Sequence, residues 1–304
     1  MFTINTLQNN ERMSTQDLLQ AINAAIETGE NDFFIEASGQ HDIGGPLWHP
    51  EGKKLRFTVT NPGQRVGCMC MENTEIIVEG SASADVGWLN AGGKIVVKGD
   101  GGDTSAHCAA SGKIYVGGRV GTRSGSMMKY DPLYSAPEFW VLKNCGSFSF
   151  EFMSGGTAVI CGYDSESFES VVGDRSCVGM VGGKLYFRGT GKGLSTKDVK
   201  SSDLAKEDVE YLKAGMKEFL ADIGQPGLEQ ELTQWNQWKK VLPLSYEERP
   251  KKASPDILSY RKTGWVQGGI FGDVCDDDWQ VYGLVATGKY RQRVPFWENM
   301  KYMA

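Results

Sequence analysis

Histidine is scarce in this chain, and its cysteines are scattered. Only three of the 304 residues are histidines, His41, His49 and His107, which leaves little material for a histidine-rich metal site or a Ser–His–Asp triad. The single close cysteine pair, Cys68 and Cys70, has one residue between its members, fewer than zinc and iron–sulfur motifs place between ligands. Because the seven cysteines are odd in number and dispersed, they are predicted to be small buried apolar residues. We therefore predict no catalytic, metal-binding or cofactor-binding residue.

The chain also lacks a basic stripe and a long apolar run. Its net charge is −6, with acids interspersed among bases, which argues against nucleic-acid binding. No apolar stretch approaches the ~18 residues of a membrane span, and the first residues lack the apolar segment of a signal peptide. No glycine-rich stretch ends in the Gly-Lys-Ser/Thr of a phosphate loop. These absences predict a cytoplasmic protein without nucleic-acid binding or membrane insertion.

Glycine, by contrast, is abundant and recurs with a period. The chain has 39 glycines, nearly twice the usual ~7% share. Four β-type segments end 19 residues apart, at Asn61, Gly80, Gly99 and Gly118. A period near 20 fits one turn of a parallel β-helix, in which each coil stacks on the one before it.

The period continues through two insertions. The next three segments end at Asn144, Gly162 and Gly189. The first step is lengthened by residues 130–137 and the last by residues near 163–172, and loop insertions of this kind leave a coil intact. The pattern predicts an all-β core over residues 53–190, a right-handed parallel β-helix of about seven coils.

Helices are predicted on both sides of the repeats. Residues 1–52 form an N-terminal helix and lead-in, with a helix over 14–28 that Ser14 caps. Residues 191–250 form a helical segment, with an amphipathic helix over 203–223 and a second short helix around 228–240.

Residues 251–304 are rich in aromatics and have little periodicity. Two interpretations stay open for this docking tail. It packs over an end of the solenoid, where backbone edges need cover, or it docks on another subunit. The possible interface residues are Trp265, Trp279, Tyr290 and Trp297.

Five arginines fall in or beside the coils: Arg65, Arg119, Arg123, Arg175 and Arg188. They either line a groove that faces an anion or are ordinary surface arginines, and the second interpretation is the default.

Two stretches within the repeats are specific enough to suggest a family. Residues 151–162 read Glu-Phe-Met-Ser-Gly-Gly-Thr-Ala-Val-Ile-Cys-Gly, and residues 178–189 read Val-Gly-Met-Val-Gly-Gly-Lys-Leu-Tyr-Phe-Arg-Gly. Together with residues 118–125, they resemble the GXGXG domain of glutamate synthase large subunits. The resemblance covers about residues 14–250 and includes a helix like that of free-standing subunits in split, archaeal-type glutamate synthases. It extends more distantly to one of the subunits of formylmethanofuran dehydrogenase.

The resemblance implies a non-catalytic scaffold subunit of a glutamate-synthase-like oxidoreductase complex. It implies amidotransferase-like and FMN/Fe–S synthase-like partner subunits in a hetero-oligomer, with FMN and Fe–S clusters in the partners and none bound by this chain. Residues 103–112 depart from the family pattern, which leaves open whether the complex still makes glutamate.

Two alternatives stay open. One is a scaffold in another redox complex, similar to formylmethanofuran dehydrogenase or N-methylglutamate synthase. The other, of a different class, is a stand-alone β-helix enzyme acting on polysaccharide. The absence of a signal peptide and of a regular acidic ladder counts against that enzyme.

Overall fold

The computed structural model describes residues 1–165, 168–245 and 247–249, and three short strands beyond them. The chain divides into two units, Met1–Arg249 and Pro250–Ala304. In the second unit, β14 (Val266–Gly268), β15 (Gly272–Cys275) and β16 (Gln280–Tyr282) pair antiparallel. The four possible interface residues of the docking tail, Trp265, Trp279, Tyr290 and Trp297, lie outside the described residues, so their role stays a prediction.

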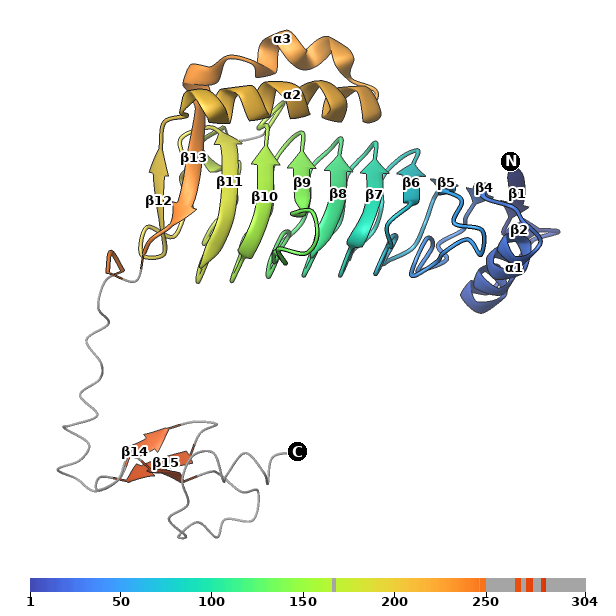
Figure 1. Cartoon of the computed structure of the whole chain (residues 1–304), viewed down its shortest axis with the longest axis horizontal. Coiled ribbons are helices and arrows are strands. Elements are labelled where there is room, and N and C mark those ends of the chain that lie inside the picture. The colour runs from blue at the N-terminus through green and yellow to red at the C-terminus, as the bar shows by residue number, and fades with distance from the viewer. Residues whose placement is uncertain (166–167, 246, 250–265, 269–271, 276–279, 283–304) are drawn as a thin grey trace. The chain divides into compact units, whose positions relative to one another are not determined.

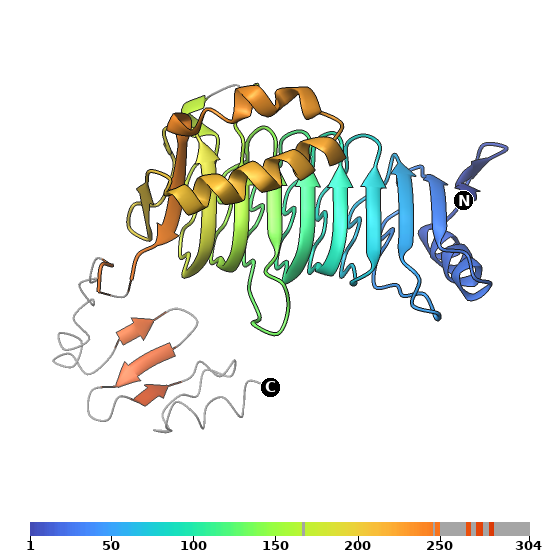
Figure 2. The same ribbon diagram turned by 45° about the horizontal axis from the view of Figure 1, so that its top comes forward.

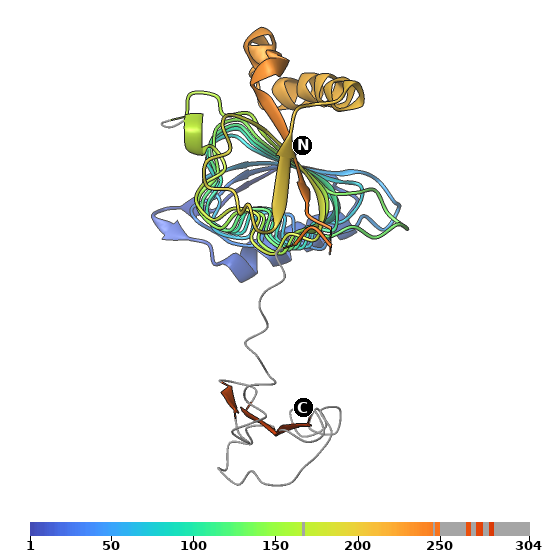
Figure 3. The same cartoon turned by 90° about the vertical axis from the view of Figure 1, so that its left-hand side faces the viewer.

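The first unit is built on one long sheet that is mostly parallel (Figure 1). Its strands follow one another in sequence order from β4 to β11, with β1 beside β4. The parallel strands are β1 (Phe2–Asn5), β4 (Asp32–Glu36), β5 (Leu55–Thr60), β6 (Thr74–Val78), β7 (Ala91–Val97), β8 (Ser111–Val116), β9 (Glu138–Val141), β10 (Ser154–Ile160) and β11 (Gly182–Arg188). Viewed along the stacking direction, the coils superimpose (Figure 3), as a β-solenoid requires.

The predicted β-helix is confirmed, with a slightly lower number of coils. In the described residues, the seven strands β5–β11 of the repeat region are joined by six turns of the chain. The solenoid therefore has about six turns rather than seven. Both predicted insertions are found, because β8 pairs with β9 and β10 with β11 in parallel across the longer connections. The first insertion projects as a loop from the foot of these strands (Figure 2).

The core lies inside the coils and consists of stacked side chains. Strand residues alternate between the inside and the outside, so like residues meet on neighbouring strands. Ile76, Ile95 and Ile114 are register neighbours, and all three are buried. Phe33 and Phe57 stack with ring centroids 4.9 Å apart. Each such side chain contributes about 1.5–3 kcal/mol by leaving water.

The corners before the strands contain backbone in the left-handed region. Arg65, Gly67 and Met69 have positive φ at alternate positions, and Asp85, Gly87 and Leu89 repeat the pattern one turn later. Gly87 has no room for a side chain, since a Cβ there would lie 2.5 Å from Ile114 Cδ1. Glycine is therefore favoured at such corners because it adopts positive φ without strain and needs no space for a side chain.

The N-terminal end is closed by α1 (Thr15–Glu27). Ser14 caps this helix, as predicted, by accepting a hydrogen bond from the Asp17 backbone N–H at 3.1 Å. Its buried face, with Leu18 and Ile22, belongs to the solenoid core. Ahead of α1, β2 (Leu7–Gln8) and β3 (Glu11–Arg12) form a small antiparallel pair.

The last strands end the parallel stack. β13 (Trp238–Pro243) pairs antiparallel with β11, and β12 (Val199–Ser202) pairs antiparallel with β13. Between them lie α2 (Lys206–Asp222), η2 (Pro226–Leu228), α3 (Glu229–Leu232) and η3 (Trp235–Gln237), while η1 (Phe168–Ser170) lies in the second insertion.

The predicted helix over 203–223 is confirmed, but the helix around 228–240 is wrong beyond its first turn. The chain leaves α3 at Leu232, and Trp238 begins a strand because the free edge of β11 offers it a ladder of backbone partners. In the described part of the chain, no helix is long and apolar enough to cross a membrane.

Candidate functional site

The outer face of the sheet becomes apolar partway along the solenoid. One register column of outward residues runs through Val96, Tyr115, Trp140, Val159 and Tyr186, on β7 to β11, and all five are buried. They form a second core with the apolar side of α2, which lies across these strands (Figure 2). The helix packs where the outward-facing residues of the strands are apolar, from β7 to β11.

Close packing fixes α2 on this column. A Cβ built at Gly215 would overlap Trp140 Cζ2, so only glycine lets the helix approach this closely. The Tyr115 ring packs edge-on against Trp140 and Phe219, with centroids 6.3 Å and 5.4 Å away.

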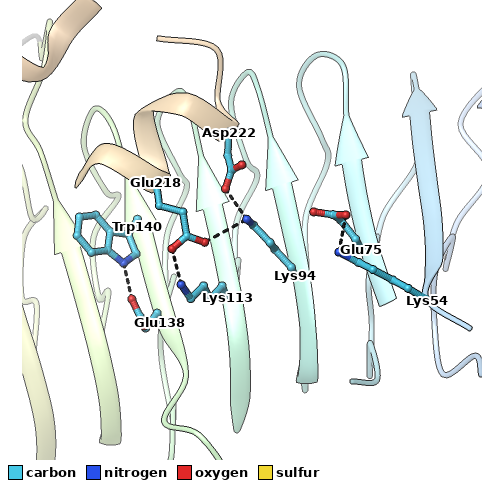
Figure 4. Close-up of polar contacts among 8 residues, drawn as sticks. All are labelled: Lys54, Glu75, Lys94, Lys113, Glu138, Trp140, Glu218 and Asp222. Carbon is cyan, nitrogen blue, oxygen red and sulfur yellow. Dashed lines mark hydrogen bonds and ion pairs between the residues drawn. The ribbon is translucent and has the colours of Figure 1, made fainter. Parts of the chain in front are cut away.

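A register column of charged residues, Glu75, Lys94, Lys113 and Glu138, runs beside the apolar column and is called the charged ladder here. Acidic residues of α2 pair with its two lysines (Figure 4). Lys94 Nζ lies 2.6 Å from Asp222 Oδ2 and 3.1 Å from Glu218 Oε1. Lys113 Nζ lies 2.6 Å from Glu218 Oε2. Burial opposes both charges, but the ion pairs outweigh it, raising the pKa of Lys94 and lowering the pKa of Glu218.

The ladder continues on both sides with internal partners. Glu138 accepts hydrogen bonds from Trp140 Nε1 at 3.0 Å and from Tyr211 Oη at 2.9 Å. Toward the N-terminal end, the Glu75 carboxylate lies 2.7 Å from Lys54 Nζ (Figure 4). These contacts tie the strands to one another and to α2, so they stabilise the fold.

Asp208 anchors the start of α2. It is 5% exposed, and it accepts hydrogen bonds from Tyr186 Oη and Lys240 Nζ, both at 2.7 Å, and from the Ala205 backbone N–H at 2.8 Å. Burial would raise the pKa of this carboxyl, but the three donors hold its pKa below the ordinary value.

The predicted burial of the cysteines is largely confirmed. Five of the six in the first unit are buried, and Cys108 is half-buried. Burial raises the pKa of Cys70 to about 12, so this thiol stays protonated and unreactive at neutral pH. In the described residues, no group of three His, Cys, Asp or Glu side chains could hold a metal ion.

The five arginines do not line one groove. Arg65 forms a two-pronged pair with Asp42, at 2.6 Å and 2.9 Å, and Arg188 Nε donates to Gln237 Oε1 at 2.7 Å. Arg119 lies beside Asp100 in the preceding turn.

Arg123 and Arg175 flank the ring of Phe148, while Arg188 lies over the ring of Phe168. Their guanidinium carbons lie 5.8 Å and 5.1 Å from the ring centroid. Beside this group, Met127 and Phe152 occupy a parallel column at the same corner of the coils. We define the corner patch as Arg123, Met127, Tyr130, Leu133, Tyr134, Phe148, Phe152 and Arg175.

Reasoning from the sequence missed both surfaces. The column under α2 could have been found from strand alternation, since Tyr115, Trp140 and Tyr186 occupy outward positions. The corner patch had a weaker signal, the three alternate phenylalanines of residues 148–152.

Comparison with known proteins matches residues 51–244 to the family described as GXGXG motif. The glutamate synthase [NADPH] large chain of Bacillus subtilis (strain 168) is 26% identical to this chain over 274 residues. The alignment covers 76% of this chain and 16% of that relative. The chain therefore corresponds to a small part of the larger protein.

Proposed function

This chain belongs to the GXGXG motif family, and from that membership we propose that it is a non-catalytic scaffold subunit of a glutamate-synthase-like oxidoreductase complex. The proposal concerns the role of the chain within an assembly. It assigns the chemistry to other subunits.

One observation carries the proposal: the family match covers all the repeat strands, β5 to β11. Residues 51–244 span β5 to β13, which is the stacked frame with α2 packed on its outer face. In this frame the conspicuous polar side chains, Asp208, Glu138 and Glu218, are engaged in contacts that hold elements together. Because these side chains stabilise the frame itself, they support a structural role for the chain.

The partners we propose are an amidotransferase-like subunit and an FMN/Fe–S synthase-like subunit. FMN and Fe–S clusters would be bound by these partners, with no cofactor on this chain. The relative's name supports a glutamate-synthase-related complex, and its greater length is consistent with catalytic parts that lie outside the shared region. We place the assembly in the cytoplasm.

The test is affinity purification of the tagged chain from its native organism, with mass spectrometry of the chains that accompany it. We expect amidotransferase-like and flavoprotein subunits in fixed ratio, and flavin and Fe–S absorbance in the eluate. The tag expressed alone is the control. A chain that elutes alone, without flavin or Fe–S absorbance, would overturn the proposal.

A further inference from the structure

We propose that the corner patch binds a partner-protein segment that presents aliphatic side chains together with a carboxylate. The aliphatic groups pack on Met127 and Phe152, and the carboxylate pairs with Arg175 and Arg123. The inference rests on the proposed function in one respect, because the partner is a subunit of that assembly.

The patch exposes large apolar side chains that lie side by side. Phe152 is 58% exposed and Met127 is 48% exposed. They occupy adjacent turns, since the Met127 backbone N–H donates to Glu151 O at 2.8 Å. Exposed apolar side chains gathered on one surface mark interaction sites, whereas single ones scattered over a surface do not.

The first insertion enlarges this surface. Its residues Leu133 and Tyr134 are 84% and 62% exposed, and Tyr130 lies against Gly155 on the neighbouring turn. The loop projects near the foot of β9 (Figure 2), and in the sequence it follows shortly after the turn that ends at Met127. The insertion therefore adds exposed apolar side chains that follow closely on Met127 in the sequence.

The backbone under the patch is strained. Phe148 and Phe152 have φ of 62° and 53°, in the left-handed region that bulky residues rarely adopt. Each such residue costs about 1–2 kcal/mol relative to ordinary backbone. Phe150 between them fills the core, but the two outer rings are not buried. Positive φ recurs at the same corner in neighbouring turns, so the backbone conformation reflects the solenoid. What bears on binding is that this corner carries an exposed Phe152 and a half-buried Phe148.

The cations of the patch determine which partner it fits. Arg175 contacts the Phe148 ring and makes no ion pair within the described part of the chain. Among the described residues, the ion pair of Arg123 is a long one, with its Nε 3.9 Å from Glu151 Oε2. A guanidinium held on an aromatic face is oriented for a carboxylate at lower entropic cost than a free arginine. The patch therefore fits an apolar segment that carries a carboxylate.

The test compares two double variants of the tagged chain in its native organism. Phe152→Asp with Arg175→Glu changes the patch. Lys213→Glu with Ala214→Asp makes the same change of charge on two exposed residues of α2. Asp is tolerated in the left-handed region better than Phe, so the patch variant should fold, and circular dichroism with thermal melting checks this.

We expect the patch variant to lose at least tenfold of one co-purifying subunit, while the α2 variant retains it. If both variants retain all partners, the proposed function stands and the patch inference fails. If the unmodified chain brings down no subunit, the proposed function itself fails.

A second measurement identifies the occupant. A photo-crosslinking amino acid at Phe152 should yield a crosslink to a partner peptide that contains aliphatic residues and an Asp or Glu. A crosslink to a second copy of this chain, to another part of the same chain, or to a segment without a carboxylate would contradict the inference.

Discussion

At the scale of single residues, much of this sequence is determined by backbone geometry. The corner positions adopt positive φ whether or not they are glycine, as Arg65, Met69 and Phe152 show. Glycine occurs where a side chain has no space, as at Gly87 below Ile114. The recurrence of glycine predicted the turns, but the non-glycine residues in the same conformation could not be predicted, because neighbouring turns impose it.

Gly215 tests the packing of α2 on the sheet. Gly215→Ala should gain up to about 1 kcal/mol of helix propensity but cost about 1–3 kcal/mol through overlap with Trp140. We expect a net loss of stability, seen as a lower melting temperature. Gly227→Ala is the control, since nothing lies within 4 Å of a Cβ there. A stabilised Gly215→Ala protein would contradict the close packing.

The stability that Asp208 contributes should depend on pH. Its pKa is lowered in the folded state, so its contribution is present at neutral pH and is lost as the pH falls through and below the ordinary Asp value of about 3.9. Asp208→Asn should lower the free energy of unfolding by about 2–4 kcal/mol at pH 7, because Lys240 loses its charged partner.

Urea unfolding between pH 7 and pH 3 measures this difference for the wild type and the variant. The two stabilities should converge as the pH falls. Glu207→Gln, at an exposed neighbouring position, is the control and should change little. A difference that stays constant with pH would show that Asp208 contributes through shape alone.

At the scale of elements, the positions of the strands and of the long helices could be predicted from the sequence. The elements against which α2 and β13 pack could not. Alternation and the 19-residue spacing located β5 to β11, and apolar periodicity located α1 and α2. The position of α2 depends on outward residues from five strands, which are separated in sequence and joined only by the register. The predicted helix around 228–240 was wrong for the same reason. Trp238 begins β13, which pairs with the distant strand β11, and the pattern of neighbouring residues does not reveal that pairing.

We expect the solenoid to tolerate deletion of most of the first insertion. Removing residues 131–136 should leave the solenoid folded, because Lys113 and Glu138 pair across the connection whatever its length. The expected change in unfolding free energy is within about 1 kcal/mol. Far-UV circular dichroism and thermal melting measure it, and a cooperative loss of structure would show that the loop is part of the frame.

At the scale of the whole molecule, the first unit has surfaces of different character. The outer sheet face is covered by α2 from β7 to β11, and Lys94 and Lys113 on that face pair with Glu218 of the helix. The corner patch instead leaves Arg175 without an ion pair in the described residues and leaves Phe152 exposed. This contrast favours the corner patch as a place where the scaffold meets another protein.

The central claim, a framework subunit within a larger assembly, is tested most directly by native mass spectrometry of the tagged chain isolated from its own organism. The account predicts a species well above the 33.4 kDa of the chain, which contains it together with a flavin-bearing subunit in defined stoichiometry. A single species at the mass of the tagged chain alone would contradict it.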